Sequence, residues 1–307
     1  MSQPNLSNAT QPAIAVIGAG IIGLTCVAEL IEAGYNKIAI YAENITPYTT
    51  SDVAAATCFP QKIYPEPENS WYQNNLFKLK QLLSVTSSGV SEMNFIEVCR
   101  DSSIKTNGYK CIQKKNIFLV NSKYHIKFLM DILANKKISI NSEKINNIHQ
   151  LTKHYEVIIN CSGLGSRELF NDQNVYPVRG QVVILSRPKD LNECIVELTE
   201  NLTYIIPRDK DCILGGTEEI NNWSVEPDEK TTRLIIGRAE QILPLLKNEK
   251  ILDVKVGLRP VRNRIRLETE KIDQSFIIHN YGHGGEGYSF AWGCAAAVKN
   301  ILKKESS

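Results

Sequence analysis

The sequence lacks the features of a membrane-spanning or nucleic-acid-binding protein. Its 307 residues contain no apolar run approaching about 18 residues, so no segment is predicted to cross a bilayer. Lysine and arginine total 35 and aspartate and glutamate total 33. The formal net charge of +2 gives no electrostatic case for binding nucleic acid or acidic lipid. Hydrophobic residues at 43% and charged residues at 22% predict an ordinary globular protein with a sizeable core.

Paired cysteine motifs are also missing. None of the eight cysteines forms a CxxC pair or a regular framework, so we expect free thiols, no metal site and a reducing compartment, the cytoplasm. Residues 1–12 are polar and are predicted to be a flexible tail rather than a signal peptide. The C-terminal sequence KKESS matches neither a lipidation signal nor the peroxisomal SKL signal.

The most informative stretch is a glycine-rich turn between a predicted strand and a predicted helix. Residues 13–23 read AIAVIGAGIIG, which places Gly18, Gly20 and Gly23 in the spacing GxGxxG before a helix predicted over 24–33. The first glycine makes the turn, the second lets the backbone approach a pyrophosphate, and the third lets the helix pack closely on the strand. The positive end of the helix dipole then favours phosphate.

A second predicted strand and an acidic residue complete this unit. The strand over 37–41 is followed by Glu43, about 20 residues beyond the glycines, where a carboxylate can accept hydrogen bonds from a ribose. This order predicts an adenine dinucleotide site. The alternative is an ordinary βαβ unit in which Glu43 is a solvated strand end.

The loop after Glu43 contains several threonines and the small residues Ala54 to Ala56. Taken alone, these alanines favour the start of an Ala-rich helix capped by Ser51 or Asp52. The alternative is that small side chains allow the backbone to approach something flat.

The rest of the chain predicts an α/β fold with two interleaved domains. Short β-rich runs at 179–185, 203–207 and 212–217 predict an antiparallel sheet distinct from the parallel one. We expect a Rossmann-like dinucleotide-binding domain, formed by residues 13–60, 138–180 and 276–305, interleaved with an antiparallel α+β substrate domain, formed by residues 61–137 and 181–275. Other predicted elements are helices at 71–83, 124–133, 231–246 and 295–302, and strands at 95–99, 117–120, 138–140, 157–160, 251–267 and 276–280.

The segment after the last predicted strand resembles a known family. Residues 277–287 read IIHNYGHGGEG and are followed by Gly293 and Ala295, which resembles the C-terminal signature of the D-amino-acid oxidase and D-aspartate oxidase family. Three more blocks resemble this family in the same order: YAENITPYTTSDVAAA, VIINCSG and GLRPVRNRIRLE. The resemblance is closer to D-amino-acid oxidase and covers most of the chain, with residues 61–137 matched only loosely.

The resemblance implies an FAD flavoprotein, so the dinucleotide-binding domain becomes an FAD-binding domain. The residues that it implies at the cofactor fall into four groups. They are Gly18, Ala19, Gly20, Ile21, Ile22, Gly23 and Glu43 at the ADP part; Thr49, Thr50, Ser51, Ala55 and Ala56 at the middle; Ile145, Cys161, Ser162 and Gly163; and Gly284, Gly285, Glu286, Gly287, Tyr288 and Ser289 at the flavin ring, with Arg259 as a further contact.

The same resemblance implies a substrate site for a D-amino acid. Arg259 matches an arginine that pairs with the substrate carboxylate, Tyr204 a tyrosine that donates to it, and the carbonyl of Gly285 would accept the amine. A planar guanidinium suits bidentate pairing with a carboxylate. No side-chain base is required when the Cα hydrogen leaves as hydride to flavin N5, and the family does not use His283 as one. Dioxygen would yield hydrogen peroxide, and the imino acid would hydrolyse to a 2-oxo acid and ammonia.

Several positions depart from the family pattern. The segment that often covers the site is short, with Glu200 roughly in place of a second tyrosine. Glu218 and Glu219 follow the GGT motif where D-aspartate oxidases carry an arginine, and Glu286 replaces an aromatic or small residue. Three acids near one pocket would favour neutral or basic D-amino acids. Ala56 and Thr57 also replace the small and apolar residues usual beside flavin N5.

Other functions stay open at this point. The chain could be a related flavin amine oxidase of the glycine, sarcosine or D-aspartate type, an amino-acid tailoring enzyme, or a flavin-binding protein without turnover. The expected partners are a small D-amino acid and dioxygen, with no nucleic acid and no membrane, and a homodimer is possible.

Overall fold

The computed structural model describes residues 11–59, 62–101, 103, 108–198 and 202–305. Most of the predicted N-terminal tail and Glu200 lie outside these described residues. Within them, no helix is long and apolar enough to cross a membrane, and no cluster of metal-ligating side chains occurs.

One group of strands is parallel and will be called the parallel half. Its order is β14-β7-β1-β2-β6, and every neighbouring pair runs parallel. The short apolar runs of β1 and β7 are fully buried, as expected for strands covered on both faces. The bounds are β1 Ile14–Ile17, β2 Ile38–Ala42, β6 Ile140–Ser142, β7 Val157–Asn160 and β14 Ser275–His283.

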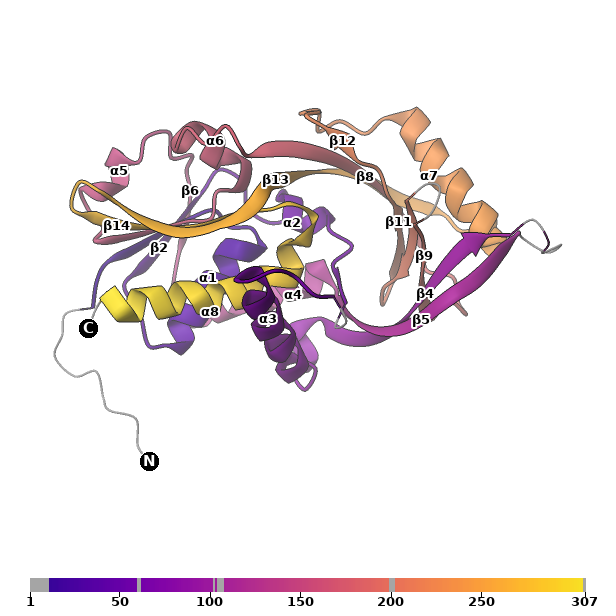
Figure 1. Ribbon diagram of the computed structural model, residues 1–307, viewed down its shortest axis with the longest axis horizontal. Helices are drawn as coiled ribbons and strands as arrows, with labels where there is room; N and C mark the ends of the chain where they lie inside the picture. The colour runs from indigo at the N-terminus through magenta and orange to yellow at the C-terminus, as the bar shows by residue number, and fades with distance from the viewer. Residues whose placement is uncertain (1–10, 60–61, 102, 104–107, 199–201, 306–307) are drawn as a thin grey trace.

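Four helices cover one face of the parallel half (Figure 1). The helices α3 and α8 approach so closely that a Cβ on Gly293 would lie 1.7 Å from the Trp71 carbonyl oxygen. Asn75 fastens the crossing, because its amide donates to the Tyr288 carbonyl at 3.2 Å and accepts from the Trp292 N–H at 3.0 Å. The four are α1 Ile21–Glu32, α3 Glu68–Leu82, α4 Ser122–Asn135 and α8 Gly287–Glu305.

The remaining strands form the antiparallel half, in which only β4 and β9 pair in parallel. The helix α7 (Glu229–Ile242) packs its apolar side, including Ile235 and Ile242, on the outer face of this half (Figure 1). The strands are β3 Thr57–Cys58, β4 Val90–Arg100, β5 Tyr109–Val120, β8 Tyr176–Ser186, β9 Glu193–Glu197, β10 Thr203–Pro207, β11 Asp211–Gly215 and β12 Glu219–Ile220.

A single long strand, β13 (Ile251–Ile272), joins the two halves. Its first part pairs with β8 and its second part with β14, with an irregularity between Val261 and Arg266. The sheet is therefore continuous in the order β3-β5-β4-β9-β10-β11-β8-β13-β14-β7-β1-β2-β6, with β12 on β8. The runs predicted to form an antiparallel sheet, now β8, β10 and β11, are antiparallel, but they belong to the same sheet as the parallel strands because β13 changes partners along its length.

Three local predictions also need correction. The helix predicted to reach residue 246 ends at Ile242, and Pro244, which cannot continue an α-helix, opens a short 3₁₀ helix over Pro244–Asn248. The strand predicted at 138–140 lies at Ile140–Ser142. No Ala-rich helix follows Glu43, because the capping box of Thr49 and Asp52 starts a short helix, α2 Thr50–Val53, and the chain is extended at Ala54.

Short elements complete the chain. These are α5 His149–Thr152, α6 Ser166–Leu169 and the 3₁₀ turns η1 Thr86–Ser88, η2 Gly163–Gly165, η3 Pro244–Asn248 and η4 Gly284–Glu286.

Candidate functional site

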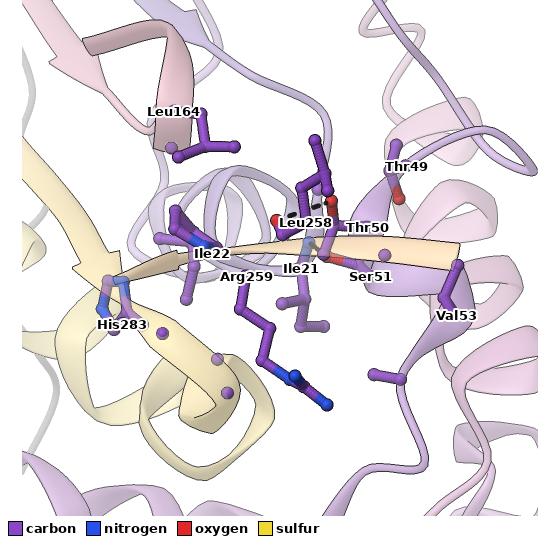
Figure 2. A pocket seen from close by; sticks show the side chains of 18 of the residues that line it. Ile21, Ile22, Thr49, Thr50, Ser51, Val53, Leu164, Leu258, Arg259 and His283 are labelled. Atoms are coloured by element: carbon purple, nitrogen blue, oxygen red, sulfur yellow. Dashed lines mark hydrogen bonds between the residues drawn. The ribbon is translucent and has the colours of Figure 1, made fainter. Parts of the chain in front are cut away.

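One cavity of about 1870 Å³ is lined by residues of both halves (Figure 2). Sites for small ligands usually have volumes of about 300–1,000 Å³, so this cavity has room for an extended ligand and a second small one. All the residues predicted at the cofactor line it except Gly23, and so do Tyr204 and Arg259. We call the region around Gly18 and Glu43 the dinucleotide end and the region around Arg259 the substrate end.

The three glycines of the dinucleotide end differ in how closely an added Cβ atom would approach the rest of the protein. Gly18 has φ +105°, and a Cβ there would lie 2.4 Å from the Cys161 carbonyl oxygen. A Cβ on Gly23 would lie 2.0 Å from the Gly18 carbonyl oxygen, so helix and strand packing excludes it. A Cβ on Gly20 would meet only the Ser51 Oγ, at 3.1 Å. The protein's own packing thus demands Gly18 and Gly23, whereas Gly20 leaves a bare backbone facing the cavity.

The start of α1 faces the cavity with no acidic residue in its first turn. The Ile21 N–H donates to Ser51 Oγ at 2.9 Å. A positive helix end beside a bare glycine backbone has the chemistry that binds a pyrophosphate. A dinucleotide therefore fits the residues present.

An exposed carboxylate and a buried apolar residue lie farther along the same end. Glu43 comes directly after β2. Lys144 Nζ lies 3.8 Å from the Oε2 atom of Glu43 and 3.4 Å from the Oε2 atom of Glu168. Ile145 is buried beside Lys144 and lines the cavity. The Glu43 carboxylate is free to accept hydrogen bonds from a ligand hydroxyl, as a ribose site requires.

The middle of the cavity is lined by α2 and the residues that flank it. Thr50 Oγ1 donates to the Leu258 carbonyl at 3.1 Å, which ties α2 to β13 (Figure 2). Ala54, Ala55, Ala56 and Thr57 then line the wall without long side chains, and Ala56 has a positive φ of 53°. The close backbone approach considered as an alternative for these alanines matches their place in the wall.

The segment from β14 into α8 forms another part of the cavity wall. The strand ends at His283, η4 follows, and α8 begins at Gly287. A Cβ on Gly285 would lie 3.4 Å from Arg259 Cδ, so this turn lies against the substrate end. The Tyr288 hydroxyl donates to the Ser51 carbonyl at 3.0 Å. The turn and the start of a second helix therefore face the cavity between the two ends.

Arg259 and Tyr204 meet at the substrate end. Arg259 extends from β13 into the cavity (Figure 2), and its Nη1 donates to the Thr217 carbonyl at 2.9 Å. Its guanidinium lies over Gly180, where a Cβ would come within 2.5 Å of Nη2. The Tyr204 ring lies against Gly215 in the same way, with a Cβ position 2.1 Å from Cζ. Both long side chains need a glycine beneath them.

The Tyr204 hydroxyl interacts with the Arg259 guanidinium. Burial raises the pKa of Tyr204, and the positive charge of Arg259 opposes this shift. A neutral phenol beside a guanidinium presents several N–H and O–H donors in one place. That set suits a carboxylate.

The three acids expected together are separated in the structure. Glu219 pairs with buried Arg179 instead of facing the cavity. Glu286 lines the cavity, but its carboxylate pairs with Lys62 and accepts from the Tyr64 hydroxyl at 2.7 Å. Of these three acids, only Glu218 lines the cavity without a cation partner in the described part of the chain. Of the three acids expected near one pocket, Glu218 and Glu286 line the cavity and Glu219 does not, because it pairs with Arg179.

His283, considered and set aside as a base, is buried, and its Nε2 has no hydrogen-bond partner among the described residues; burial lowers its pKa to about 3, so it is neutral. Some other cavity residues were not singled out from the sequence. Leu198, Leu202, Trp223 and Val225 add an apolar rim. No sequence motif marks these apolar residues, which follow β9, precede β10 or follow β12.

The sequence and the fold both match known proteins. A family model described as FAD dependent oxidoreductase matches residues 131–301. A D-amino-acid oxidase of Rubrobacter xylanophilus is 31% identical, covering 91% of this chain and 92% of the relative. A D-amino-acid oxidase of Dictyostelium discoideum is 32% identical (94% and 90%), and the D-aspartate oxidase of Homo sapiens is 28% identical (95% and 94%).

Among solved structures, glycine oxidase from Bacillus cereus has a similar fold. It superposes with a TM-score of 0.80 at 18% identity and covers 96% of each chain. These matches agree with the geometry of the cavity, which has the glycine-rich turn and the starts of α1 and α8 along its wall and Arg259 at its substrate end. This chain therefore belongs to the FAD-dependent oxidoreductase family that contains the D-amino-acid oxidases.

Proposed function

We propose that this protein oxidises D-amino acids to 2-oxo acids, ammonia and hydrogen peroxide. The observation that supports this most directly is the Arg259 and Tyr204 pair, held over Gly180 and Gly215 at one end of a cavity that also has a dinucleotide cradle. The names of the curated relatives support the same reaction.

Each step that the chain performs is one of positioning. The Arg259 guanidinium holds the substrate carboxylate, the Tyr204 hydroxyl donates to it, and the Gly285 carbonyl accepts from the amine. These contacts fix two substituents of Cα, the carboxylate and the amine, and the requirement that the Cα hydrogen faces the flavin would supply the third constraint that selects one enantiomer. The Cα hydrogen would leave as hydride to bound FAD, and dioxygen would reoxidise the reduced flavin and be released as hydrogen peroxide. The apolar rim limits the access of water.

We further propose that neutral and basic side chains are favoured over acidic ones. Glu218 follows Thr217, whose carbonyl accepts from Arg259, and its negative charge raises the pKa of Tyr204. An acidic substrate side chain near this carboxylate would be repelled. Glu219 and Glu286 add little to this preference, since each has a cation partner.

The first experiment is anaerobic mixing of the FAD-loaded protein with D- and L-amino acids while the flavin absorption is followed. D-alanine and D-arginine should bleach the flavin, L-enantiomers should not, and air should restore the colour with release of peroxide. Glu218→Gln should raise the rate with D-aspartate relative to D-arginine by about tenfold, because the repulsion is removed. Glu229→Gln, which alters an exposed acid on α7, is the matched control.

Two outcomes would contradict the proposal. A flavin that no D-amino acid reduces would exclude the activity, and reduction by glycine or L-proline alone would assign another amine oxidation. D-aspartate as the best substrate of the wild-type protein would overturn the side-chain preference.

We also propose a reducing compartment, the cytoplasm. All eight cysteines are free thiols, and six of them are buried. Burial raises the pKa of Cys58, Cys194 and Cys212 to about 12, so these thiols are unreactive.

A further inference from the structure

The substrate-end arginine is connected to the outer face of the sheet through one residue, Thr217. The Thr217 carbonyl accepts from Arg259 Nη1 at 2.9 Å, and its Oγ1 accepts from the Gln181 N–H at 2.9 Å. Thr217 is thus anchored on one side to the cavity arginine and on the other to the backbone of β8. Its position decides where the guanidinium can lie.

Gln181 extends this connection to α7. Its Oε1 accepts from the Asp228 N–H at 2.8 Å, and its Nε2 donates to the Asp228 carbonyl at 2.9 Å and to Thr232 Oγ1 at 2.8 Å. Asp228 is also the N-cap of α7, where its Oδ1 accepts from the Thr231 N–H. A fully buried amide therefore fixes the start of α7 relative to β8.

Arg179 is the centre of this network and is only 2% exposed. Its Nη1 pairs with Glu219, and its Nη2 donates to Gln181 Oε1 at 2.9 Å. Its guanidinium also donates to two loop carbonyls, that of Ser224 from Nε at 3.0 Å and that of Glu226 from Nη2 at 2.7 Å. Arg179 thereby clamps the middle of the segment between Thr217 and Asp228 to β8, and Gln181 holds the two ends of this segment.

We propose that Arg179 is a positioning residue for substrate binding, acting through Thr217 on Arg259. The two arginines leave β8 and the paired β13 on opposite faces, since Leu258 pairs with Arg179 and Arg259 with Val178. Arg179 cannot touch the substrate. It holds the segment that supplies the Thr217 carbonyl, which accepts from Arg259, so it keeps the guanidinium ready for a carboxylate.

The expected effect is on binding rather than on the chemical step. A guanidinium that is free to move loses part of its affinity for the carboxylate in the ground state and in the transition state alike. KM should therefore rise while kcat stays nearly constant. This inference rests on the proposed function only for its kinetic part, because carboxylate binding can be measured without turnover.

The test uses the FAD-loaded protein and propionate, whose binding is followed by the change in flavin absorption. Arg179→Gln should raise the Kd of propionate about tenfold when Arg259 is present, but less than about twofold in an Arg259→Lys background. Thr217→Val, which removes the Oγ1 acceptor at a half-buried site, should raise Kd about threefold. Arg233→Gln, which alters an exposed arginine on α7, should leave Kd unchanged.

The outcomes separate this inference from the proposed function. If Arg179→Gln raises the Kd of propionate by the same factor with and without the Arg259→Lys change, Arg179 acts through general stability, and the inference is overturned. An unchanged Kd in both Arg179→Gln and Thr217→Val would overturn it as well. If Arg179→Gln fails to retain FAD, Thr217→Val alone decides. A wild-type protein that binds propionate but is reduced by no D-amino acid would refute the function and leave the binding result standing.

Discussion

The two ends of the cavity are built from different materials. At the dinucleotide end the main chain and small residues form the surface, and a Cβ on Gly18 or Gly23 would clash with backbone atoms. At the substrate end long side chains, Arg259 and Tyr204, lie over glycines and are held by hydrogen bonds. A dinucleotide, with its many phosphate and sugar atoms, is therefore suited to binding by the main chain, whereas a small amino acid has few atoms and depends on a charged side chain for binding.

The largest effects are expected when Gly23 and Gly20 of the dinucleotide end are replaced, one at a time, by alanine. Gly23→Ala should prevent formation of the FAD-loaded protein, because its Cβ would lie 2.0 Å from the rigid Gly18 carbonyl. Gly20→Ala should fold, since its Cβ meets only Ser51 Oγ at 3.1 Å, but should weaken FAD binding by about tenfold or more. Thermal unfolding of the FAD-free proteins and flavin titration measure the two effects. Equal unfolding temperatures for both variants would contradict this expectation.

At the substrate end, removing charge should affect binding without affecting the cofactor. Arg259→Met should lower kcat/KM for D-amino acids by about 10³-fold, because the carboxylate loses a charged, bidentate partner. The FAD content should stay near that of the wild type. Steady-state rates and the flavin absorbance of the purified variant provide both values. A drop of less than about tenfold would remove Arg259 from the substrate site.

Acid should weaken the core that supports both ends. The pKa of buried His125 falls to about 4 and that of His283 to about 3, mainly because burial disfavours the charged ring. Both values lie below about 6.5 for the unfolded chain, so the unfolded state binds protons first. The stabilising contribution of the two neutral rings is therefore fully present above pH 6.5 and is lost as the pH falls toward the pKa values of the folded protein. Each histidine should lower the free energy of unfolding by about 2 kcal/mol at pH 5.

Urea unfolding at pH 7 and pH 5 tests this loss. Replacement of the exposed His154 by Gln should leave the pH dependence unchanged. An unfolding free energy that is the same at both pH values would show that neither ring is held neutral.

The smallest effect is expected at the edge of the cavity. Glu286→Gln should lower stability by less than about 1 kcal/mol and change kcat/KM by less than about threefold, because its pair with Lys62 is partly exposed. Lys62→Met should behave similarly. Thermal unfolding and steady-state rates measure both. A large drop in kcat/KM would move Glu286 from the rim into the substrate site.

The dinucleotide end could be predicted in detail from the sequence. The turn around Gly18, the strand before it and the acid at Glu43 interact within about 30 residues, and each obeys a local geometric rule. The strand over Thr203–Pro207 was predicted with the correct bounds, because its apolar residues are compact and end at a proline. Arg259 and Tyr204 were singled out through the family resemblance, and their roles remain proposals, as do the domain limits.

The partners of the acids could not be predicted. Glu219 and Arg179 are 40 residues apart and meet only because β12 pairs with β8. Glu286 and Lys62 are separated by 224 residues. A carboxylate in a sequence carries no sign of the cation that neutralises it when the contact depends on tertiary structure. The change of partners along β13 was missed for the same reason, because the residue pattern of one strand does not predict which strands lie beside it.

The continuous strand β13 has a mechanical consequence. Arg259 lies in its β8-paired part, and its next part is hydrogen-bonded to β14, which ends at the turn over Gly284–Glu286. Val261, two residues beyond Arg259, pairs with His283 of β14, so one strand joins the arginine proposed to bind the carboxylate to the turn proposed to face the flavin. The distance between these two parts of the site is therefore fixed by the backbone hydrogen bonds of one sheet.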